Sequence, residues 1–249
     1  MLLDVDTGYE GKFDFPRRAA EPDLVYMLAS IPRTGSTYLS HLLWQTGCLG
    51  APLEYLNFEK TGPYYFASHS PDTQARLWRS VLHRRTSPNG IFGFKIFPIQ
   101  LQALNQQNPA LLQALQPSRI VYLTRRDRIA HIVSLARASV SGVWRKEQEA
   151  GERAPPAYSQ EALDMAERGI EVQAAGWEKL FAERGIDPLR LDYEDVVARP
   201  AEAAARVAAY LGVALEPGAE VRVPAVLKQS GAGTEDWAAR YAASKAAAG

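Results

Sequence analysis

The sequence feature that most constrains the fold is an apolar segment followed directly by a polar turn and a helix-like stretch. Residues 24–30 (LVYMLAS) are mostly apolar, which is typical of a strand buried in a parallel sheet. Residues 32–37 (PRTGST) form the turn. In the stretch YLSHLLWQTG that follows, apolar side chains recur at helical spacing, and Gly47 marks the expected end of the helix. The sequence therefore predicts a strand, a tight turn and a helix in direct succession.

Segments of the same two kinds alternate along the rest of the chain. Further strands are expected at residues 91–97, 119–124 and 189–196 (LRLDYEDV). Further helices are expected from Asp127, which can cap a helix, to about residue 140, from about residue 160 to Gly185, and after Pro200. This alternation predicts an α/β fold with a doubly wound, mainly parallel sheet flanked by helices.

Two stretches show no regular pattern. Residues 51–80 are rich in aromatic side chains and prolines and are expected to be irregular, and the last residues, SKAAAG, are expected to fray. No repeat and no convincing linker interrupts the chain, so we expect one domain over residues 1–249, with its core at about residues 22–242.

Composition excludes several classes of protein. The chain has 249 residues with 28 Lys+Arg and 28 Asp+Glu, so its neutral balance gives no reason to expect a nucleic-acid partner. Its single cysteine, Cys48, excludes an intramolecular disulfide and a cysteine-based zinc cluster. The N-terminal residues lack the layout of a signal peptide, and no apolar run approaches the ~18 residues of a membrane span. We expect a cytoplasmic protein with no membrane span.

The polar turn at residues 32–37 is a candidate anion site. A turn between a strand and a helix aims backbone N–H groups and the positive end of the helix at one point. Gly35 permits close approach of a ligand, Ser36 and Thr37 add hydroxyl donors, and Arg33 supplies a cation. The alternative is an ordinary helix N-cap, with the serine and the threonine in the places where they are common.

The turn differs from the loop of a nucleoside triphosphatase by one residue type. That loop needs a lysine after its last glycine to reach the terminal phosphates, and here Ser36 follows Gly35. A phosphate-binding loop without this lysine suits a 5′-phosphate that carries a sulfuryl group, whose lower charge makes magnesium less necessary.

A second cluster of charge follows the expected strand at residues 119–124. Arg125 and Arg126 come at the carboxyl end of that strand, where open α/β sheets bind their ligands, and Ser134 lies further along the next helix. The alternative for each arginine is a solvated position on the surface.

Five motifs follow one another along the chain: PRTGST, TGCLGAPLEY at residues 46–55, PNG through Gly93 to Lys95, RRDRIAHIVS, and a late K-Q-S-x₅-D-W segment. In this order they resemble the trehalose 2-sulfotransferase family of bacteria, whose enzymes use 3′-phosphoadenosine 5′-phosphosulfate (PAPS). The resemblance extends from about Leu24 to Tyr241 and implies the P-loop-like fold of sulfotransferases.

The resemblance implies a set of nucleotide-binding residues. Those implied to hold the 5′-phosphosulfate are Arg33, Thr34, Gly35, Ser36 and Thr37. Ser134 with either Arg125 or Arg126 is implied to hold the 3′-phosphate. Lys228 and Gln229 resemble a late nucleotide-binding loop, although Gln229 and Ser230 depart from the common sulfotransferase pattern there.

The resemblance also implies the chemistry. Glu54 matches the general base of the family, and a carboxylate suits this role because the acceptor hydroxyl must lose its proton as the S–O bond forms. An ordinary surface glutamate is the alternative. Lys95, together with Arg33, is expected to stabilise charge during an in-line transfer, without a metal and with release of adenosine 3′,5′-bisphosphate (PAP).

The expected function is therefore transfer of a sulfuryl group from PAPS to a hydroxyl of a carbohydrate or glycolipid. Aromatic residues 55–66 and Trp144 are candidates for stacking on the sugar, or alternatively for filling the core. Two other functions remain open: a P-loop-like small-molecule kinase, and a non-catalytic relative that binds a nucleotide or glycan. Relatives of this kind can be homodimers, but no segment of the sequence encodes this.

Overall fold

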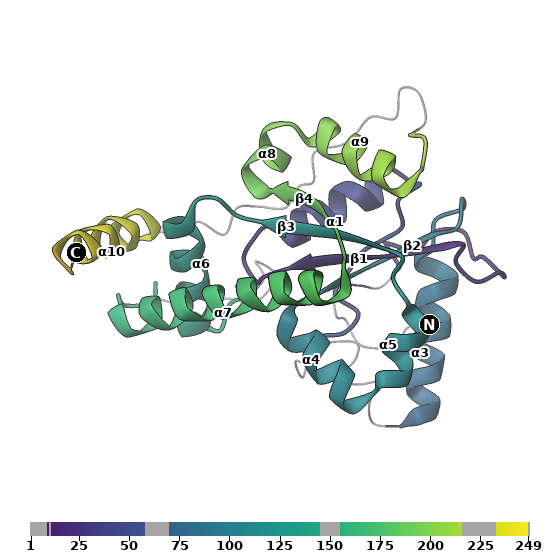
Figure 1. The fold of residues 1–249 in the computed structure, drawn as a ribbon, viewed down its shortest axis with the longest axis horizontal. Helices are drawn as coiled ribbons and strands as arrows, with labels where there is room; N and C mark the ends of the chain where they lie inside the picture. The colour runs from purple at the N-terminus through teal and green to yellow at the C-terminus, as the bar shows by residue number, and fades with distance from the viewer. Residues whose placement is uncertain (1–8, 10, 58–69, 145–154, 216–232, 249) are drawn as a thin grey trace.

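The computed structural model describes residues 9, 11–57, 70–144, 155–215 and 233–248. Its centre is a sheet of four parallel strands in the order β2-β1-β3-β4 (Figure 1). The strands are β1 (Leu24–Ser30), β2 (Ile91–Ile96), β3 (Arg119–Thr124) and β4 (Leu189–Asp192). The parallel α/β fold predicted from the alternating pattern is confirmed.

Nine helices accompany the strands in the described part of the chain. They are α1 (Ser36–Gln45), α3 (Pro71–Arg85), α4 (Pro98–Gln107), α5 (Pro109–Leu115), α6 (Arg128–Ser141), α7 (Gln160–Arg184), α8 (Tyr193–Ala198), α9 (Pro200–Leu211) and α10 (Thr234–Ala248). As expected, the side chain of Asp127 caps α6 by accepting a hydrogen bond from the Ala130 N–H, and Gly185 ends α7 in the left-handed conformation.

The helices form a layer on each face of the sheet. Alternate residues of a strand point to opposite faces, and β1 shows this clearly. Tyr26 and Leu28 pack in a core cluster with α1, α8 and α9, whereas Met27 and Ala29 belong to the second cluster, with α3, α4, α6 and α7 (Figure 1). Both faces of the sheet are therefore buried, as in a doubly wound fold.

The strand order determines where a ligand can bind. The chain leaves β1 for β2 on one side and then crosses to β3 on the other side of β1. Where connections depart in opposite directions, a crevice opens beyond the carboxyl ends of the strands. The carboxyl ends of β1 and β3 flank this reversal, so a ligand is expected there, next to the two segments predicted to bind anions.

Three local predictions were wrong. Residues 71–80 are part of α3, which begins at a proline after the capping hydroxyl of Ser70. The predicted strand over residues 189–196 ends at Asp192, because its second half is α8. The C-terminal residues expected to fray are helical as far as Ala248. None of the helices in the described ranges is long and apolar enough to cross a membrane.

Candidate active site

The turn after β1 leaves the start of α1 without a side-chain cap. The N-cap residue is Gly35, with φ of 82°, and within the described ranges α1 has no side-chain cap hydrogen bond. Ser36 and Thr37 are already helical, so the alternative in which they serve as ordinary N-caps is wrong. Arg33 also has a positive φ, 71°, a conformation that is strained for a residue with a side chain. The turn therefore presents a bare helix N-terminus, as an anion site requires.

Glycine is required at position 35 by the ring of Tyr193 as well as by the backbone. A Cβ atom built on Gly35 would lie 2.2 Å from Cδ2 of Tyr193, the first residue of α8. The same ring also contacts Arg125, whose guanidinium lies over it with Cζ 5.3 Å from the ring centre. Tyr193 was not identified from the sequence, because its segment was interpreted as a strand.

Arg33, Arg125 and Ser134 meet at the ends of β1 and β3. Nε of Arg33 donates to the hydroxyl of Ser134 at 3.1 Å, and Nη1 of Arg125 donates to the carbonyl of Arg33 at 3.3 Å. A further donor of Arg33, Nη1, bonds the carbonyl of Trp144 at 2.8 Å. Residues predicted from separate motifs are thus parts of one cluster.

The electrostatics of this cluster favour an anion. Burial and, to a lesser degree, the nearby Arg125 lower the pKa of Arg33, because two cations are held together away from water. Nε of Arg125 is buried and has no hydrogen-bond partner among the residues that the structure describes. A buried donor without an acceptor is costly, and a phosphate oxygen would satisfy it.

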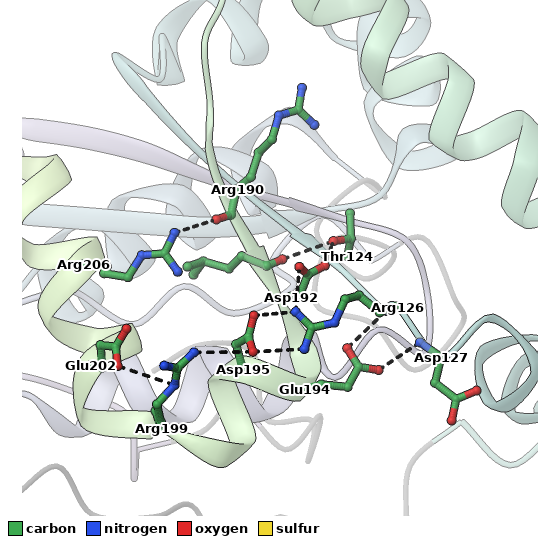
Figure 2. A network of polar contacts seen from close by, with 11 residues as sticks. Thr124, Arg126, Asp127, Arg190, Asp192, Glu194, Asp195, Arg199, Glu202 and Arg206 are labelled. Atoms are coloured by element: carbon green, nitrogen blue, oxygen red, sulfur yellow. Dashed lines mark hydrogen bonds and ion pairs between the residues drawn. The ribbon is translucent and has the colours of Figure 1, made fainter.

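Arg126, the neighbour of Arg125, lies in a network of acidic residues (Figure 2). Its guanidinium donates to both carboxylate oxygens of Asp195, at 2.6 and 2.9 Å, and to Asp192 at 3.2 Å. Hydrogen bonds with Asp195 raise the pKa of Arg126. Glu194 accepts hydrogen bonds from the backbone N–H groups of Arg126 and Asp127, both at 3.1 Å. The structure thus joins Arg125 to the turn and uses Arg126 to attach this segment to α8.

Glu54 and Lys95 form a buried ion pair beside the start of α1. Nζ of Lys95 lies 3.0 Å from Oε2 of Glu54, and the two side chains are 5% and 12% exposed. The same ammonium donates to the hydroxyl of Thr37 at 3.3 Å. The interpretation of Glu54 as an ordinary surface residue is wrong. A carboxylate that can accept a proton therefore lies next to an ammonium and a helix N-terminus that can stabilise negative charge.

His131 supports the turn from α6. It is 3% exposed, and its Nε2 lies 2.8 Å from the carbonyl of Pro32. Burial, with smaller contributions from Arg125 and Arg33, lowers the pKa of His131 to about 4. The imidazole is therefore neutral near pH 7, and its Nε2–H donates to Pro32. The contact holds the residue before Arg33, which agrees with a structural role.

Some predicted residues cannot be placed. Lys228, Gln229 and residues 58–66 of the aromatic segment lie outside the described residues. Tyr55 is buried in the core and donates its hydroxyl proton to the carbonyl of Ala51 at 2.5 Å, so it fills the core. In the ranges that the structure covers, no three side chains gather in a way that could hold a metal ion.

Comparison with known proteins gives consistent matches. The family model described as Stf0 sulphotransferase matches residues 25–244. The trehalose 2-sulfotransferase of Mycobacterium tuberculosis is 29% identical over 264 aligned positions, which cover 91% of this chain and 96% of the relative. The trehalose 2-sulfotransferase of Mycolicibacterium smegmatis is 24% identical, and the aligned part covers 87% of this chain and 93% of the relative. Among solved structures, a sulfotransferase from Alicyclobacillus acidocaldarius superposes with a TM-score of 0.48 and 14% identity, over 92% of this chain and 94% of its own.

Proposed function

Because the chain belongs to the Stf0 sulphotransferase family, we propose that this enzyme moves a sulfuryl group from PAPS to a carbohydrate hydroxyl by in-line transfer. The observation that carries the proposal is the meeting of three elements at one edge of the sheet. The turn after β1 bears Arg33, the end of β3 bears Arg125, and the end of β2 bears Lys95 in contact with Glu54.

The residues fit the two anionic ends of PAPS. Arg125, whose buried Nε has no partner in the described part of the chain, and Ser134 are suited to the 3′-phosphate. The bare N-terminus of α1 and Thr37 are suited to the 5′-phosphosulfate. Arg33 lies between these groups and is hydrogen-bonded to Ser134, so it can interact with either end. PAPS, when bound, supplies the activated sulfuryl group.

Glu54 and Lys95 are suited to the chemical step. Glu54 would accept the proton of the attacking hydroxyl, and a positioned general base typically contributes a factor of about 10²–10⁴ to the rate. Lys95 and the N–H groups of the turn would stabilise the negative charge that develops on the transferred group and on the leaving phosphate. Donors fixed before the reaction need no reorganisation during it.

The acceptor is proposed from the relatives. Both curated relatives are named for the sulfation of trehalose, and the chain covers nearly the whole length of each. Trehalose is therefore the first acceptor to test, with other free sugars and glycolipids after it.

The experiment is transfer of ³⁵S-labelled sulfate from PAPS, in EDTA, to trehalose, a panel of other sugars and extracted glycolipids. The proposal predicts one labelled carbohydrate product and its loss in Glu54→Gln. Failure to label any acceptor, with magnesium-dependent phosphate transfer from ATP to the same panel, would favour the kinase instead. Binding of PAP without transfer to any acceptor would favour the third possibility, a non-catalytic relative that binds a nucleotide.

A further inference from the structure

We infer that Gln100 is a positioning residue that orients the carboxylate of Glu54, so that Oε2 of Glu54 is the oxygen that accepts the proton. The inference rests on the proposed function, in which Glu54 is the general base. Gln100 is on α4, is 6% exposed, and donates from Nε2 to Oε1 of Glu54 at 2.7 Å.

The orientation of the Gln100 amide is fixed by a second contact. Its Oε1 accepts a hydrogen bond of 3.0 Å from the backbone N–H of Phe97, at the start of α4. A backbone N–H can only donate, so the atom that faces it must be the amide oxygen, and the atom that faces Glu54 must be the NH₂ group. Gln100 therefore presents a donor to Glu54 and holds Oε1 in place.

The two oxygens of Glu54 have partners of different kinds. Oε1 bonds Gln100, whose amide is held by the backbone, whereas Oε2 bonds the ammonium of Lys95, a compact charge with three donors on a flexible stem. Lys95 already reaches Thr37 at the anion-binding turn. An anion bound at this turn competes with Glu54 for Lys95, and Oε2 is the oxygen that is released.

In the transfer step that follows, two bonds break and two bonds form. The O–H bond of the acceptor breaks and its proton passes to Oε2 of Glu54, while the acceptor oxygen forms a bond to sulfur. The bond between sulfur and the bridging oxygen breaks, and its electron pair remains on the 5′-phosphate. During this step Gln100 keeps its donor on Oε1 and so keeps Oε2 directed at the hydroxyl.

A purely structural role for Gln100 is the competing explanation, because its contact with Phe97 also caps α4. Gln100→Glu separates the two roles. A glutamate at this position can still accept the Phe97 hydrogen bond, since glutamate and glutamine both complete such a cap. Its ionised form cannot donate to Glu54, and it places a like charge beside it. Lys95 of β2 is the charged group bonded to Glu54, and α4 and α1 contribute the uncharged Gln100 and Thr37.

The experiment compares Gln100→Glu with Gln102→Glu, a matched change at an exposed position of the same helix. The kcat of sulfuryl transfer is measured between about pH 5 and about pH 9, and the Kd of PAP is measured by titration. For Gln100→Glu we expect kcat near pH 7 to fall about tenfold or more and its acidic limb to move to higher pH, with the Kd of PAP within about twofold of wild type. The Gln102→Glu protein should match wild type.

A kcat and acidic limb equal to those of wild type in Gln100→Glu would overturn the inference. If Gln100→Glu does not bind PAP, Gln100→Met, which adds no charge, replaces it. Retention of wild-type kcat in Gln100→Met would also overturn the inference. Glu54→Gln identifies which idea has failed: if this variant still transfers the sulfuryl group, the proposed base is wrong, and if only the Gln100 variants are active, the positioning role is wrong.

Discussion

Arg33 and Ser134 are hydrogen-bonded to each other, although one follows the first strand and the other lies within α6. The distance from Nε of Arg33 to Oγ of Ser134 is 3.1 Å. The contact joins the segment expected to bind the 5′ end of the nucleotide to the segment expected to bind the 3′-phosphate. The two motifs therefore form one site, and substitutions in either should change affinity for the same ligand.

Arg125→Ala should weaken binding of PAP much more than binding of AMP, which lacks the 3′-phosphate. A charge-assisted hydrogen bond contributes about 1.5–3 kcal/mol, which corresponds to a Kd for PAP raised by about tenfold to one hundredfold. Calorimetric titration of both nucleotides gives the comparison.

Arg126→Ala is the matched control, because it removes the same charge from the neighbouring position. Its contacts are with Asp192 and Asp195, so the Kd of PAP should stay within about threefold of wild type. If Arg126→Ala weakens PAP binding and Arg125→Ala does not, the two arginines are assigned to the wrong roles.

Gly35→Ala should abolish PAP binding and destabilise the protein. The new methyl group would lie 2.2 Å from the ring of Tyr193, and the φ of 82° adds strain of about 1–2 kcal/mol. Gly142→Ala is the control, since Gly142 also has a positive φ, 69°, but has nothing within 4 Å of the new atom. Thermal unfolding with and without PAP should show a larger loss for Gly35→Ala. Equal losses, with PAP binding intact, would mean that the contact with Tyr193 is unimportant.

Glu54→Gln should lower kcat by about a hundredfold or more without weakening the binding of PAP, because the amide keeps the shape of the carboxylate but is not a base. Glu183→Gln, at an exposed position of α7, should have wild-type kcat. Steady-state kinetics with saturating PAPS give kcat, and a Glu54→Gln enzyme with wild-type turnover would remove Glu54 from the mechanism.

His131 should make the protein less stable as the pH falls from about 6.5 to about 4. The folded protein holds this imidazole neutral because burial lowers its pKa to about 4, whereas the unfolded chain takes up a proton near the ordinary value of 6.5. The free energy of unfolding therefore falls by up to roughly 3 kcal/mol as the pH falls through this window. Above about pH 6.5 His131 does not change it. Urea unfolding as a function of pH should show a smaller slope for His131→Gln, which can still donate to Pro32. Parallel curves for the two proteins would contradict this assignment.

The parts of the fold predicted well are those with strong local signals. β1 and β3 have the predicted boundaries, since each is an apolar run between clear turns. The helix α3 was missed because prolines and aromatic residues precede it, although Ser70 followed by Pro71 is itself a helix-start signal. Residues 193–196 were misassigned to the strand because Val196 suits a strand, whereas Asp192 and the acidic residues after it suit the start of a helix.

The site was predicted only as far as local motifs allow. The sequence predicted an anion site at Arg33, Ser134 and one of the two arginines Arg125 and Arg126, but it could not choose between these arginines. That choice depends on Asp192 and Asp195, which are distant in sequence and reach Arg126 only in the folded protein (Figure 2). Gln100 gave no signal for the same reason, because its partner Glu54 lies in a different segment.

We propose that the turn containing Arg33 binds the anionic nucleotide without a metal ion. The most direct measurement is thermal unfolding of the wild type and of Arg33→Ala with increasing PAP in EDTA. We expect PAP to raise the Tm of the wild type and this shift to be lost in Arg33→Ala. No shift in the wild type, or an equal shift in Arg33→Ala, would contradict it.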